Sequence, residues 1–423
     1  MKYLSLGDEI FLLESHLKNT HIVYAPLKRR LFYTKDVEAV EIEKSFKNGG
    51  CCDTDLDERI SDLMSTQDAT VHKYYGFGMK KRHTVFILTE ACNLACTYCY
   101  AHEQHSAETL TKDKLKNTID FIFSSRTKGK HFSFIGGGEP CVKWELFVWA
   151  VEYIRKLQKD QKVSISLTTN TTLLNAERIQ WLVKNQVHIG CSFDILPEIQ
   201  NIQRPYPSGK GSFVDVKNSI DLLAENGVDF GFRTTITQTA VEKMPEMVEY
   251  VSENYPKIRK IHLELVSMPG LTWENYYHDF MNYFFKAKAV AKTKNIYLRN
   301  SVINSLQSIR NRFCGGEFCV TPSGDIVACH RNSNNRALAF EQLKYGVVSN
   351  DAVLVDENKM KSISDLYERK RVKECETCFM KYHCNSQCCS NKLAYSDKDF
   401  AELCNFTKEM ALRELEERAN LSV

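Results

Sequence analysis

The sequence has no uninterrupted run of about eighteen apolar residues, which is roughly the length that a helix needs to cross a bilayer. Its first segment, MKYLSLGDEIF, carries acidic residues too early for a signal peptide. The 56 basic residues are spread among 53 acidic ones instead of gathering into a stripe, so the usual footprint of a nucleic-acid-binding protein is missing. We therefore expect a cytoplasmic protein that engages neither a membrane nor nucleic acid.

Cysteine is the residue type that stands out. The chain has 423 residues, of which 16 are cysteines, and this length is enough for about two or three domains. A disulfide framework is typical of short secreted chains, whereas this chain is long and lacks a signal sequence, so metal ligation explains the cysteines better. Most of them fall into two dense groups, within residues 92–99 and residues 314–389.

The first group is the stretch Cys92-Asn93-Leu94-Ala95-Cys96-Thr97-Tyr98-Cys99-Tyr100, which directly follows the apolar run His83–Leu88, a predicted β-strand. Three thiolates in one short loop can converge on one iron–sulfur cluster, because soft sulfur ligands favour such clusters and zinc. A structural zinc site is normally closed by four protein ligands, so a set of three indicates a distant fourth ligand or an open metal position. Buried structural cysteines or a zinc loop are the alternatives.

Between His83 and Val266, short β-rich runs alternate with longer amphipathic segments. The predicted strands are His83–Thr89, His131–Ile135, Val163–Thr169, Val187–Phe193, Phe230–Thr237 and Ile261–Val266. The predicted helices are Lys112–Ser125, Trp144–Lys159, Ala176–Lys184, Phe213–Asn226 and Val241–Glu253. Such alternation produces a parallel sheet with right-handed crossovers. We therefore predict an α/β fold, an open, partial (β/α)6 TIM-like barrel.

Polar motifs follow these strands at their carboxyl ends, where the chemistry of such barrels gathers. Gly136-Gly137-Gly138-Glu139-Pro140 follows the second strand. Its glycines allow the backbone to approach a ligand closely, and its carboxylate can accept hydrogen bonds from an ammonium group. The remaining candidates at or beyond strand ends are Asn170, Ser192, Asp194, Arg204 and Arg233. An ordinary glycine turn and satisfied structural polar groups are the simpler explanations.

The spacing CxxxCxxC, followed at once by an aromatic residue, resembles the signature loop of radical S-adenosylmethionine (SAM) enzymes. The resemblance implies that Cys92, Cys96 and Cys99 hold three irons of a [4Fe–4S] cluster, whose fourth iron takes the amino and carboxylate groups of SAM. The glycine-rich turn resembles the family's GGEP motif, and Ser192-Phe193-Asp194 resembles its SxD motif. The implied SAM contacts are Tyr100 by the adenine, Gly137, Gly138 and Glu139 at the methionine amine, the polar groups of Asn170, Ser192 and Asp194, and either Arg204 or Arg233 at the methionine carboxylate.

The second cysteine group opens with the run from Cys314 to Cys329, which predicts two strands joined by a turn at residues 322–325. It continues as Cys375-x2-Cys378-x5-Cys384-x3-Cys388, with Cys404 beyond. This pattern resembles the seven-cysteine SPASM domain, which carries two auxiliary [4Fe–4S] clusters. The implied ligands are Cys314, Cys329 and Cys388 for the first auxiliary cluster, and Cys375, Cys378, Cys384 and Cys404 for the second. Cys319 is either a fourth ligand of the first cluster or a strand residue facing away, and a zinc ribbon is the alternative for the whole set.

These motifs divide the chain into four predicted parts. Residues 1–80 contain strand-like pieces and two helical stretches, which predict a small winged-helix-like module resembling a leader-peptide recognition domain, or a plain extension. Residues 81–268 are the radical SAM barrel, and residues 269–312 an aromatic helical bridge. Residues 313–423 are a cysteine-rich iron–sulfur domain, ending in a charged helix at Lys408–Arg418 with an expected solvated face.

The resemblance implies an enzyme in which the reduced cluster passes an electron to SAM, and a 5′-deoxyadenosyl radical then removes a hydrogen atom from an inert C–H bond. The implied cofactors are SAM and three [4Fe–4S] clusters. We predict a maturase that installs a thioether, a carbon–carbon crosslink or a related oxidation in a ribosomally made precursor peptide with a leader, served by a flavodoxin- or ferredoxin-type electron donor. The alternatives are an anaerobic sulfatase-maturating enzyme that forms formylglycine, and a non-catalytic iron–sulfur electron-transfer protein.

Overall fold

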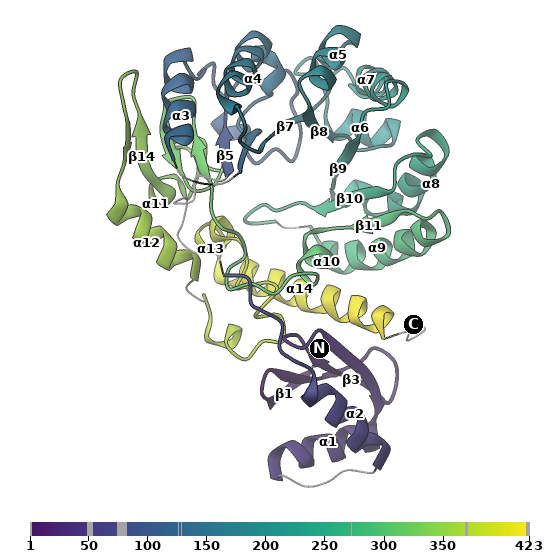
Figure 1. Cartoon of the computed structure of the whole chain (residues 1–423). Helices are drawn as coiled ribbons and strands as arrows, with labels where there is room; N and C mark the ends of the chain where they lie inside the picture. The colour runs from purple at the N-terminus through teal and green to yellow at the C-terminus, as the bar shows by residue number, and fades with distance from the viewer. Residues whose placement is uncertain are drawn as a thin grey trace. The chain divides into compact units, whose positions relative to one another are not determined.

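The computed structural model of this protein (Figure 1) describes residues 2–48, 54–73, 83–125, 127, 129–271, 273–368 and 371–419. The chain divides into two compact units. The first comprises Met1–Tyr75, Ser301–Cys314 and Tyr367–Val423, and the second comprises Gly76–Asn300 and Gly315–Leu366. Within the described ranges, no helix has the length and apolar content that crossing a membrane requires.

The second unit is built on one large sheet. Its described strands are β5 (His83–Phe86), β6 (Lys130–Phe134), β7 (Val163–Thr169), β8 (Val187–Ser192), β9 (Phe230–Ile236), β10 (Lys260–Leu265), β11 (Tyr297–Arg299), β12 (Phe318–Val320), β13 (Asp325–Val327), β14 (Lys344–Val348) and β15 (Val353–Val355). Their order is β11-β10-β9-β8-β7-β6-β5-β12-β13-β14-β15. Neighbours from β11 to β12 are parallel, and those from β12 to β15 are antiparallel. The carboxyl ends of the parallel strands therefore share one edge of the sheet.

Helices cover the outer face of the parallel strands (Figure 1). They are α3 (Lys112–Ser124), α4 (Trp144–Gln158), α5 (Ala176–Lys184), α6 (Pro197–Gln203), α7 (Phe213–Glu225) and α8 (Met244–Asn254), and the unit also contains α9 (Tyr276–Thr293), α11 (Phe340–Leu343) and most of α12 (Glu357–Glu368). Alternate side chains of each strand point toward this layer. Phe134 of β6, for example, packs edge-on against Phe147 of α4, with ring centroids 4.9 Å apart. This packing buries one apolar face of the sheet.

The predicted α/β barrel is confirmed. The six predicted strands and five predicted helices are present, with ends shifted by a few residues. The sheet is longer than expected because β12, from the cysteine hairpin, pairs in parallel with β5 and places Cys319 opposite Val85. The predicted domain boundaries stay predictions, and the first of them, at residue 80, lies outside the described residues.

The first unit begins with an antiparallel meander in the order β1-β2-β3-β4. The helices and strands of the first unit are β1 (Tyr3–Gly7), β2 (Ile10–Glu14), β3 (Thr20–Ala25), β4 (Arg30–Lys35), α1 (Asp36–Asn48), α2 (Thr54–Ser65), α10 (Ser301–Ser305), α13 (Cys389–Ala394) and α14 (Asp397–Arg418). The sequence missed β2, because Ile10, Phe11, Leu12 and Leu13 are all buried and the strand lacks the alternation that reveals a half-buried one. The winged-helix-like description of this module stays a prediction.

The solvated-face interpretation of the C-terminal helix is wrong for part of α14. Glu416 is fully buried, and its carboxylate accepts hydrogen bonds from the Ser15 hydroxyl and the His16 amide, both at 2.7 Å. The His16 ring lies 3.1 Å from the same carboxylate. A run of charged residues indicates a solvent-exposed face only when no distant segment packs against it. Here the segment that follows the second strand of the N-terminal meander packs against α14.

Candidate functional site

The first cysteine loop leaves the carboxyl end of β5 and is tied to the segment that follows α6. The amide of Ala95 donates to the carbonyl of Pro205 at 2.8 Å, and the amide of Thr97 donates to the carbonyl of Gln203 at 2.9 Å. These main-chain bonds fix the loop independently of its cysteine side chains. The loop therefore presents its thiols from a held backbone.

The three thiols of this loop are partly buried and influence one another. Burial raises the pKa of the Cys92 thiol to about 12 and that of Cys96 to about 11, and it also raises the pKa of Cys99. Cys96 and Cys99 further raise the pKa of Cys92 through charge repulsion. Thiolates gathered in this way are stable at neutral pH when a cation binds them, so the loop has the chemistry of a metal site.

The glycine-rich turn after β6 lies against the start of this loop so closely that side chains are excluded. A Cβ on Gly138 would come 2.0 Å from the carbonyl oxygen of Ala91, and one on Gly137 would come 2.5 Å from the Ile87 side chain. Gly137 also adopts a φ of +62°. The turn therefore needs glycine at both positions, because any side chain there would collide with its neighbours. An ordinary glycine turn has no such requirement.

Glu139 is held at the centre of this turn. Its carboxylate is buried and accepts hydrogen bonds from the amides of Cys141 and Asn170, at 2.9 and 2.7 Å, and from the Thr169 hydroxyl at 2.7 Å. Burial raises the pKa of Glu139, while these hydrogen bonds oppose the rise. The Glu139 amide donates to the carbonyl of Ala91 at 2.9 Å, which places this residue beside the start of the cysteine loop.

Asn170 links the end of β7 to the same loop. Its side-chain amide donates to the Asn93 oxygen at 2.9 Å, and the Asn93 amide donates to the Thr172 hydroxyl at 2.7 Å. The Asn170 oxygen accepts from the Thr172 amide and hydroxyl. Asn93 stands between Cys92 and the rest of the loop, so this network orients the first thiol.

Asp194 and Arg204 form a buried ion pair beneath the loop. The Asp194 carboxylate accepts from Arg204 Nε at 2.9 Å and Nη2 at 3.2 Å, and also from the Tyr98 hydroxyl at 2.8 Å and Gln203 Nε2 at 2.7 Å. The Arg204 guanidinium lies 5.2 Å from the centre of the Tyr98 ring. Its charge lowers the pKa of Cys96 against the larger effect of burial. Both residues thus support the loop, and their predicted SAM contacts stay predictions.

The remaining predicted SAM contacts come from neighbouring strands and from the end of the cysteine loop. Ser192 of β8 pairs in register with Arg233 of β9, whose side chain is exposed. Tyr100 is 40% exposed, and the Arg331 guanidinium lies 5.7 Å from its ring centre. Arg331 in turn donates to the Ser267 carbonyl at 3.0 Å. Tyr100 therefore offers an aromatic surface at the strand-end edge.

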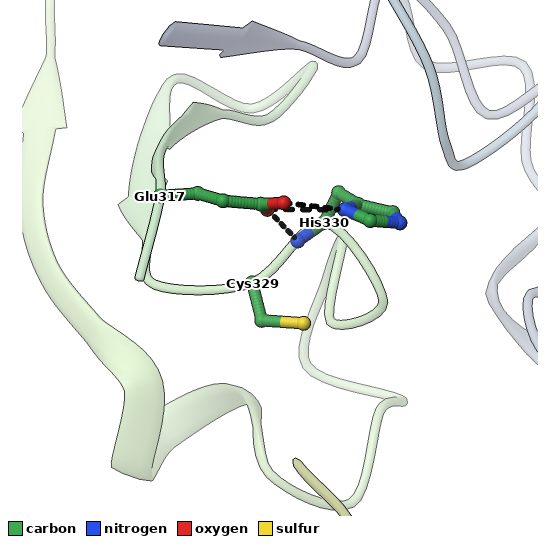
Figure 2. Close-up of side chains that lie close together, drawn as sticks. All are labelled: Glu317, Cys329 and His330. Atoms are coloured by element: carbon green, nitrogen blue, oxygen red, sulfur yellow. Dashed lines mark hydrogen bonds and ion pairs between the residues drawn. The ribbon is translucent and has the colours of Figure 1, made fainter. Parts of the chain in front are cut away.

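A second group of ligand-type atoms lies at the end of the cysteine hairpin. Glu317, Cys329 and His330 have side-chain atoms within 4.8 Å of one another (Figure 2). The Glu317 carboxylate accepts from the His330 amide at 2.7 Å and lies 2.9 Å from His330 Nδ1. Burial raises the pKa of Glu317, but the His330 ring brings it below its usual value. A Cβ on Gly136 would lie 3.3 Å from His330, so the pair adjoins the glycine turn.

Cys319 lies elsewhere in the same hairpin. It is fully buried in an apolar cluster with Val85, Ile87, Val327 and Phe340. Burial raises the pKa of its thiol well above the usual value. This environment suits a strand residue of the core, which is one of the two roles that the sequence leaves open for Cys319. The other role, as a cluster ligand, stays a prediction.

The four cysteines predicted to hold the second auxiliary cluster surround one cavity in the first unit. This cavity has a volume of about 70 Å³ and is lined by Cys375, Cys378, Cys384 and Cys404 together with Tyr3, Lys381 and Lys408. Burial raises the pKa of Cys384 and of Cys404 to about 12, and the neighbouring thiols raise both further. Four converging thiols in a small cavity fit a metal–sulfur centre.

The cysteines predicted to hold the first auxiliary cluster belong to different units. Cys314 and Cys388 lie in the first unit, and Cys329 lies in the second. Cys388 is the N-cap residue of α13. This ligand set stays a prediction.

A larger cavity, of about 900 Å³, opens at the opposite, amino-terminal ends of the strands. Its lining includes His83, His131, Ser164 and His188. Burial lowers the pKa of His131 to about 4, and its Nδ1 lies 2.7 Å from the Ser164 hydroxyl. None of the predicted SAM or metal residues lines this cavity, so its size does not mark the site.

Sequence reasoning missed several residues that build the site. Asn93 and Tyr98 lie inside the cysteine loop, and their position between the thiols was a usable signal. Gln203, Glu317 and His330 carried none, because each meets its partner through the fold. Their roles become visible only when distant segments are brought together.

The comparisons with known proteins agree with this geometry. Residues 86–251 match the family model described as the Radical SAM superfamily. An uncharacterized protein of Methanocaldococcus jannaschii is 31% identical over 174 residues, which is 41% of this chain and 59% of that protein. A cysteine-type anaerobic sulfatase-maturating enzyme of Clostridium perfringens is 26% identical over 172 residues, 39% of this chain and 46% of that enzyme. The matches thus span about half of these curated relatives.

Two groups of solved structures have a similar fold. The structure of anSMEcpe with bound AdoMet superposes with a TM-score of 0.67 at 20% identity, covering 80% of this chain and 99% of that one. Streptococcus suis SuiB bound to precursor peptide SuiA superposes with a TM-score of 0.57 at 15% identity, covering 92% of this chain and 98% of that one. At these identities the likeness is one of fold. The similarity to the Radical SAM superfamily is carried by residues 86–251.

Proposed function

We propose that this protein is a radical SAM maturase that modifies a peptide or protein substrate at an unactivated C–H bond. The observation that carries the proposal is the convergence of the cysteine loop after β5 and the buried Glu139 after β6 at one edge of the barrel. The family implies SAM and a [4Fe–4S] cluster as cofactors. The superfamily match covers both motifs.

The cysteine loop fits the cluster that the family implies. Cys92, Cys96 and Cys99 are three soft ligands in a held backbone, and their raised pKa values are those expected of thiols that a cation must stabilise as thiolates. When bound and reduced, the cluster supplies the electron that cleaves SAM to a 5′-deoxyadenosyl radical. The protein supplies position and exclusion of water.

We assign the methionine amine of SAM to Glu139. Its carboxylate is already oriented by three hydrogen bonds, and its amide holds the residue at the start of the cysteine loop. An ammonium group is the partner that a buried carboxylate prefers. Gly137 and Gly138 keep the backbone open at this point. Tyr100 is assigned to the adenine and Arg233 to the methionine carboxylate, because the charge of Arg204 is already paired with Asp194.

We assign the cavity of the first unit to the second auxiliary cluster, with Cys375, Cys378, Cys384 and Cys404 as its ligands. The proposed ligands of the first auxiliary cluster are Cys314, Cys329 and Cys388. Because Cys319 packs in an apolar cluster, we propose that it is not a ligand and that one iron of the first cluster is left without a cysteine.

The proposed substrate is a ribosomally made precursor peptide, on which a thioether, a carbon–carbon crosslink or a related oxidation is installed. The fold likeness to SuiB bound to its precursor peptide supports this class. The N-terminal module is proposed to recognise the leader, and a flavodoxin- or ferredoxin-type protein is the proposed electron donor.

A sulfatase-maturating reaction is the second candidate. The sequence similarity to anaerobic sulfatase-maturating enzymes and the fold likeness to anSMEcpe favour it. Its product would be formylglycine on a sulfatase, formed from a cysteine or a serine. The two candidates share every SAM-binding residue and differ only in the substrate.

The test uses the full chain, reconstituted anaerobically with iron and sulfide and supplied with SAM and a low-potential reductant. Release of 5′-deoxyadenosine is the expected result, and its absence from the loaded protein would contradict the proposal in favour of an electron-transfer protein. Mass spectrometry then compares a precursor peptide encoded near the gene with a sulfatase-derived peptide containing cysteine. A mass change in the precursor peptide supports the first candidate, and a change only in the sulfatase peptide supports the second.

A further inference from the structure

The strands β8, β9, β10 and β11 stand side by side in the second unit (Figure 1). Each of them alternates between buried residues and residues that are half-buried or exposed. In β10, for example, Ile261 and Leu263 are buried, whereas His262 between them is half-buried. Successive side chains of a strand point to opposite faces. The buried residues therefore face the helices, and the others line the opposite, inner face of these four strands.

Four residues of this inner face form one row across the strands. Ser192 of β8 pairs in register with Arg233 of β9. On β10, His262 pairs with Arg233 on one side and with Arg299 of β11 on the other. Side chains of directly opposed residues on neighbouring strands share a face and lie close together. The row thus begins at the serine of the SxD-like motif and places two arginines on either side of a histidine.

The two arginines of the row lack a counter-charge. Arg233 is exposed, and Arg299 is half-buried, with its Nε shielded from solvent. Within the ranges that the structure describes, no carboxylate forms an ion pair with either guanidinium and no acceptor takes a hydrogen bond from it. Arg204, by contrast, is neutralised by Asp194 at 2.9 Å. A shielded N–H group without a partner costs free energy, so this arrangement favours a bound anion.

The acidic residue that shares this face of β10 is held by the histidine of the row. Glu264 lies two residues beyond His262 on the same strand, and its Oε2 lies 2.7 Å from Nε2 of His262. The two side chains are 27% and 15% exposed, respectively. Glu264 is therefore fixed against β10 and does not pair with Arg233 or Arg299.

The inner face beside the row has room for a ligand. Gly190 of β8 and Gly231 of β9 pair in register, so neither strand carries a side chain there. A Cβ on Gly231 would meet no atom of the described residues within 4 Å, and a Cβ on Gly190 would lie 3.9 Å from Cδ of Arg233. Because neighbouring strands are ~4.8 Å apart, the Cα atoms of Arg233 and Arg299 are separated by about 10 Å. The two guanidiniums can therefore hold two different carboxylates.

We propose that Arg299 is a specificity-determining residue that binds a carboxylate of the substrate, so that the protein acts on acidic peptide segments. This inference rests on the proposed function, in which the substrate is a peptide or protein and Arg233 takes the methionine carboxylate of SAM. With Arg233 so occupied, Arg299 is the guanidinium of the row that stays available. The anions of an unmodified peptide are the carboxylates of aspartate, glutamate and the C terminus, and the planar guanidinium binds a carboxylate through two parallel hydrogen bonds.

The experiment selects peptides with the full-length protein, loaded anaerobically with iron and sulfide and supplied with SAM. The probes are two libraries of random peptides, one with free C-terminal carboxylates and one with C-terminal amides. The wild-type protein is compared with Arg299→Gln and with Arg259→Gln. Arg259 is an exposed arginine just before β10, at the opposite end of that strand, so its replacement removes the same charge away from the row. Bound peptides are sequenced by mass spectrometry.

The wild-type protein and Arg259→Gln are expected to enrich peptides that carry carboxylates, and Arg299→Gln to lose this enrichment about tenfold or more, because a hydrogen bond to a charged group is removed. Enrichment of aspartate and glutamate in the amidated library identifies a side chain as the source of the carboxylate, and enrichment in the free-acid library alone identifies the C terminus. A wild-type protein without preference for carboxylates would overturn the proposal. An equal preference in Arg299→Gln, or an equal loss in Arg259→Gln, would do the same.

Two further measurements keep the outcome unambiguous. If equilibrium dialysis shows that Arg299→Gln binds SAM about tenfold more weakly than Arg259→Gln, Arg299 serves SAM and the proposal is overturned. Should Arg299→Gln not fold, the wild-type protein decides through phenylglyoxal, which modifies accessible guanidiniums. The selected peptides are expected to protect Arg299 and to leave Arg259 reactive, and equal modification of Arg299 with and without peptide would overturn its role.

The failure of the proposed function is a separate result. A loaded wild-type protein that releases no 5′-deoxyadenosine would contradict the maturase. The peptide selection needs binding and no turnover, so it would still measure the carboxylate site. Release of 5′-deoxyadenosine without any preference for carboxylates would leave the maturase in place and overturn only the role of Arg299.

Discussion

Replacing Asp194 by asparagine is expected to destabilise the second unit more than the same replacement of an exposed aspartate. The Asp194 side chain has no exposed surface, and its two oxygens accept from four partners, which are Arg204, Tyr98, Gln203 and the amide of Thr235. An amide has one accepting oxygen in place of two, and its nitrogen would face a donor. Asp194→Asn therefore leaves hydrogen bonds unmade and a buried guanidinium without a counter-charge.

The expected magnitude follows from the burial of the pair. Arg204 is 7% exposed, so water cannot solvate the charge that Asp194 now neutralises. Removing one partner of a buried ion pair costs ~3–5 kcal/mol, against a total stability of about 5–15 kcal/mol for a typical domain. Replacing both partners by groups of similar shape is far less costly. The double variant Asp194→Asn, Arg204→Met is therefore expected to regain part of the loss.

The assay is guanidinium unfolding of the reduced, metal-free chain, followed by tryptophan fluorescence. Trp144, Trp149, Trp181 and Trp273, the four tryptophans of the sequence, all belong to the second unit, so the signal reports on the barrel. Asp215→Asn is the control, because Asp215 accepts from the Tyr206 hydroxyl at 2.9 Å but is 37% exposed. Its expected cost is below about 1 kcal/mol. Two results would refute the assignment of a buried, mutually dependent ion pair. One is a loss of unfolding free energy in Asp194→Asn that is no larger than in this control, and the other is a double variant that is less stable than Asp194→Asn.

Three further predictions concern the cluster, SAM and pH. Cys96→Ala should abolish release of 5′-deoxyadenosine and remove about one cluster of iron while the auxiliary clusters stay, and unchanged cleavage would contradict the assigned ligand. Glu139→Gln should weaken SAM binding by about ten- to a hundredfold in equilibrium dialysis, because a hydrogen bond to a charged group contributes ~1.5–3 kcal/mol; equal affinity would place the methionine amine elsewhere. Hydrogen bonds to Glu409 and Glu416 raise the pKa of His16 from 6.5 to about 9. Because the pKa of His16 is higher in the folded than in the unfolded state, its ion pairs stabilise the fold fully below pH 6.5. This stabilisation is lost as the pH rises through 9. After allowance for the half-exposed ring, the stabilisation amounts to ~1–2 kcal/mol. The unfolding free energies of the wild-type protein and His16→Gln should differ by this amount near pH 6 and be equal near pH 10.

The barrel could be predicted because its information is local. Each of the strands β5 to β9 is a short β-rich run followed by an amphipathic helix, and the spacing of Cys92, Cys96 and Cys99 lies within one loop. The glycine turn before Glu139 is equally local. Where the pattern repeats within a few residues, the sequence and the structure agree to within a few positions.

The parts that could not be predicted depend on segments far apart in the chain. β2 has no alternation because it is buried on both faces. Cys319 lies among the cysteines of the hairpin, yet its pairing with Val85 and Val327 directs it into an apolar cluster. The role of Asp194 as an anchor for Arg204 could not be separated from a role in SAM binding, since both need a polar side chain at a strand end.

The first and last segments of the chain illustrate the physical reason. The partners of Tyr3 and His16 lie about four hundred residues later, at Phe379 and Glu416. The meander has an apolar cluster of its own, which includes Ile10, Val23 and other residues of the strands and of α1 and α2, so it can form from local contacts, whereas its polar contacts wait for the C-terminal segment. The meander does not need those polar side chains for its own core. Their presence on it is explained by the cysteine site and the helix that they meet.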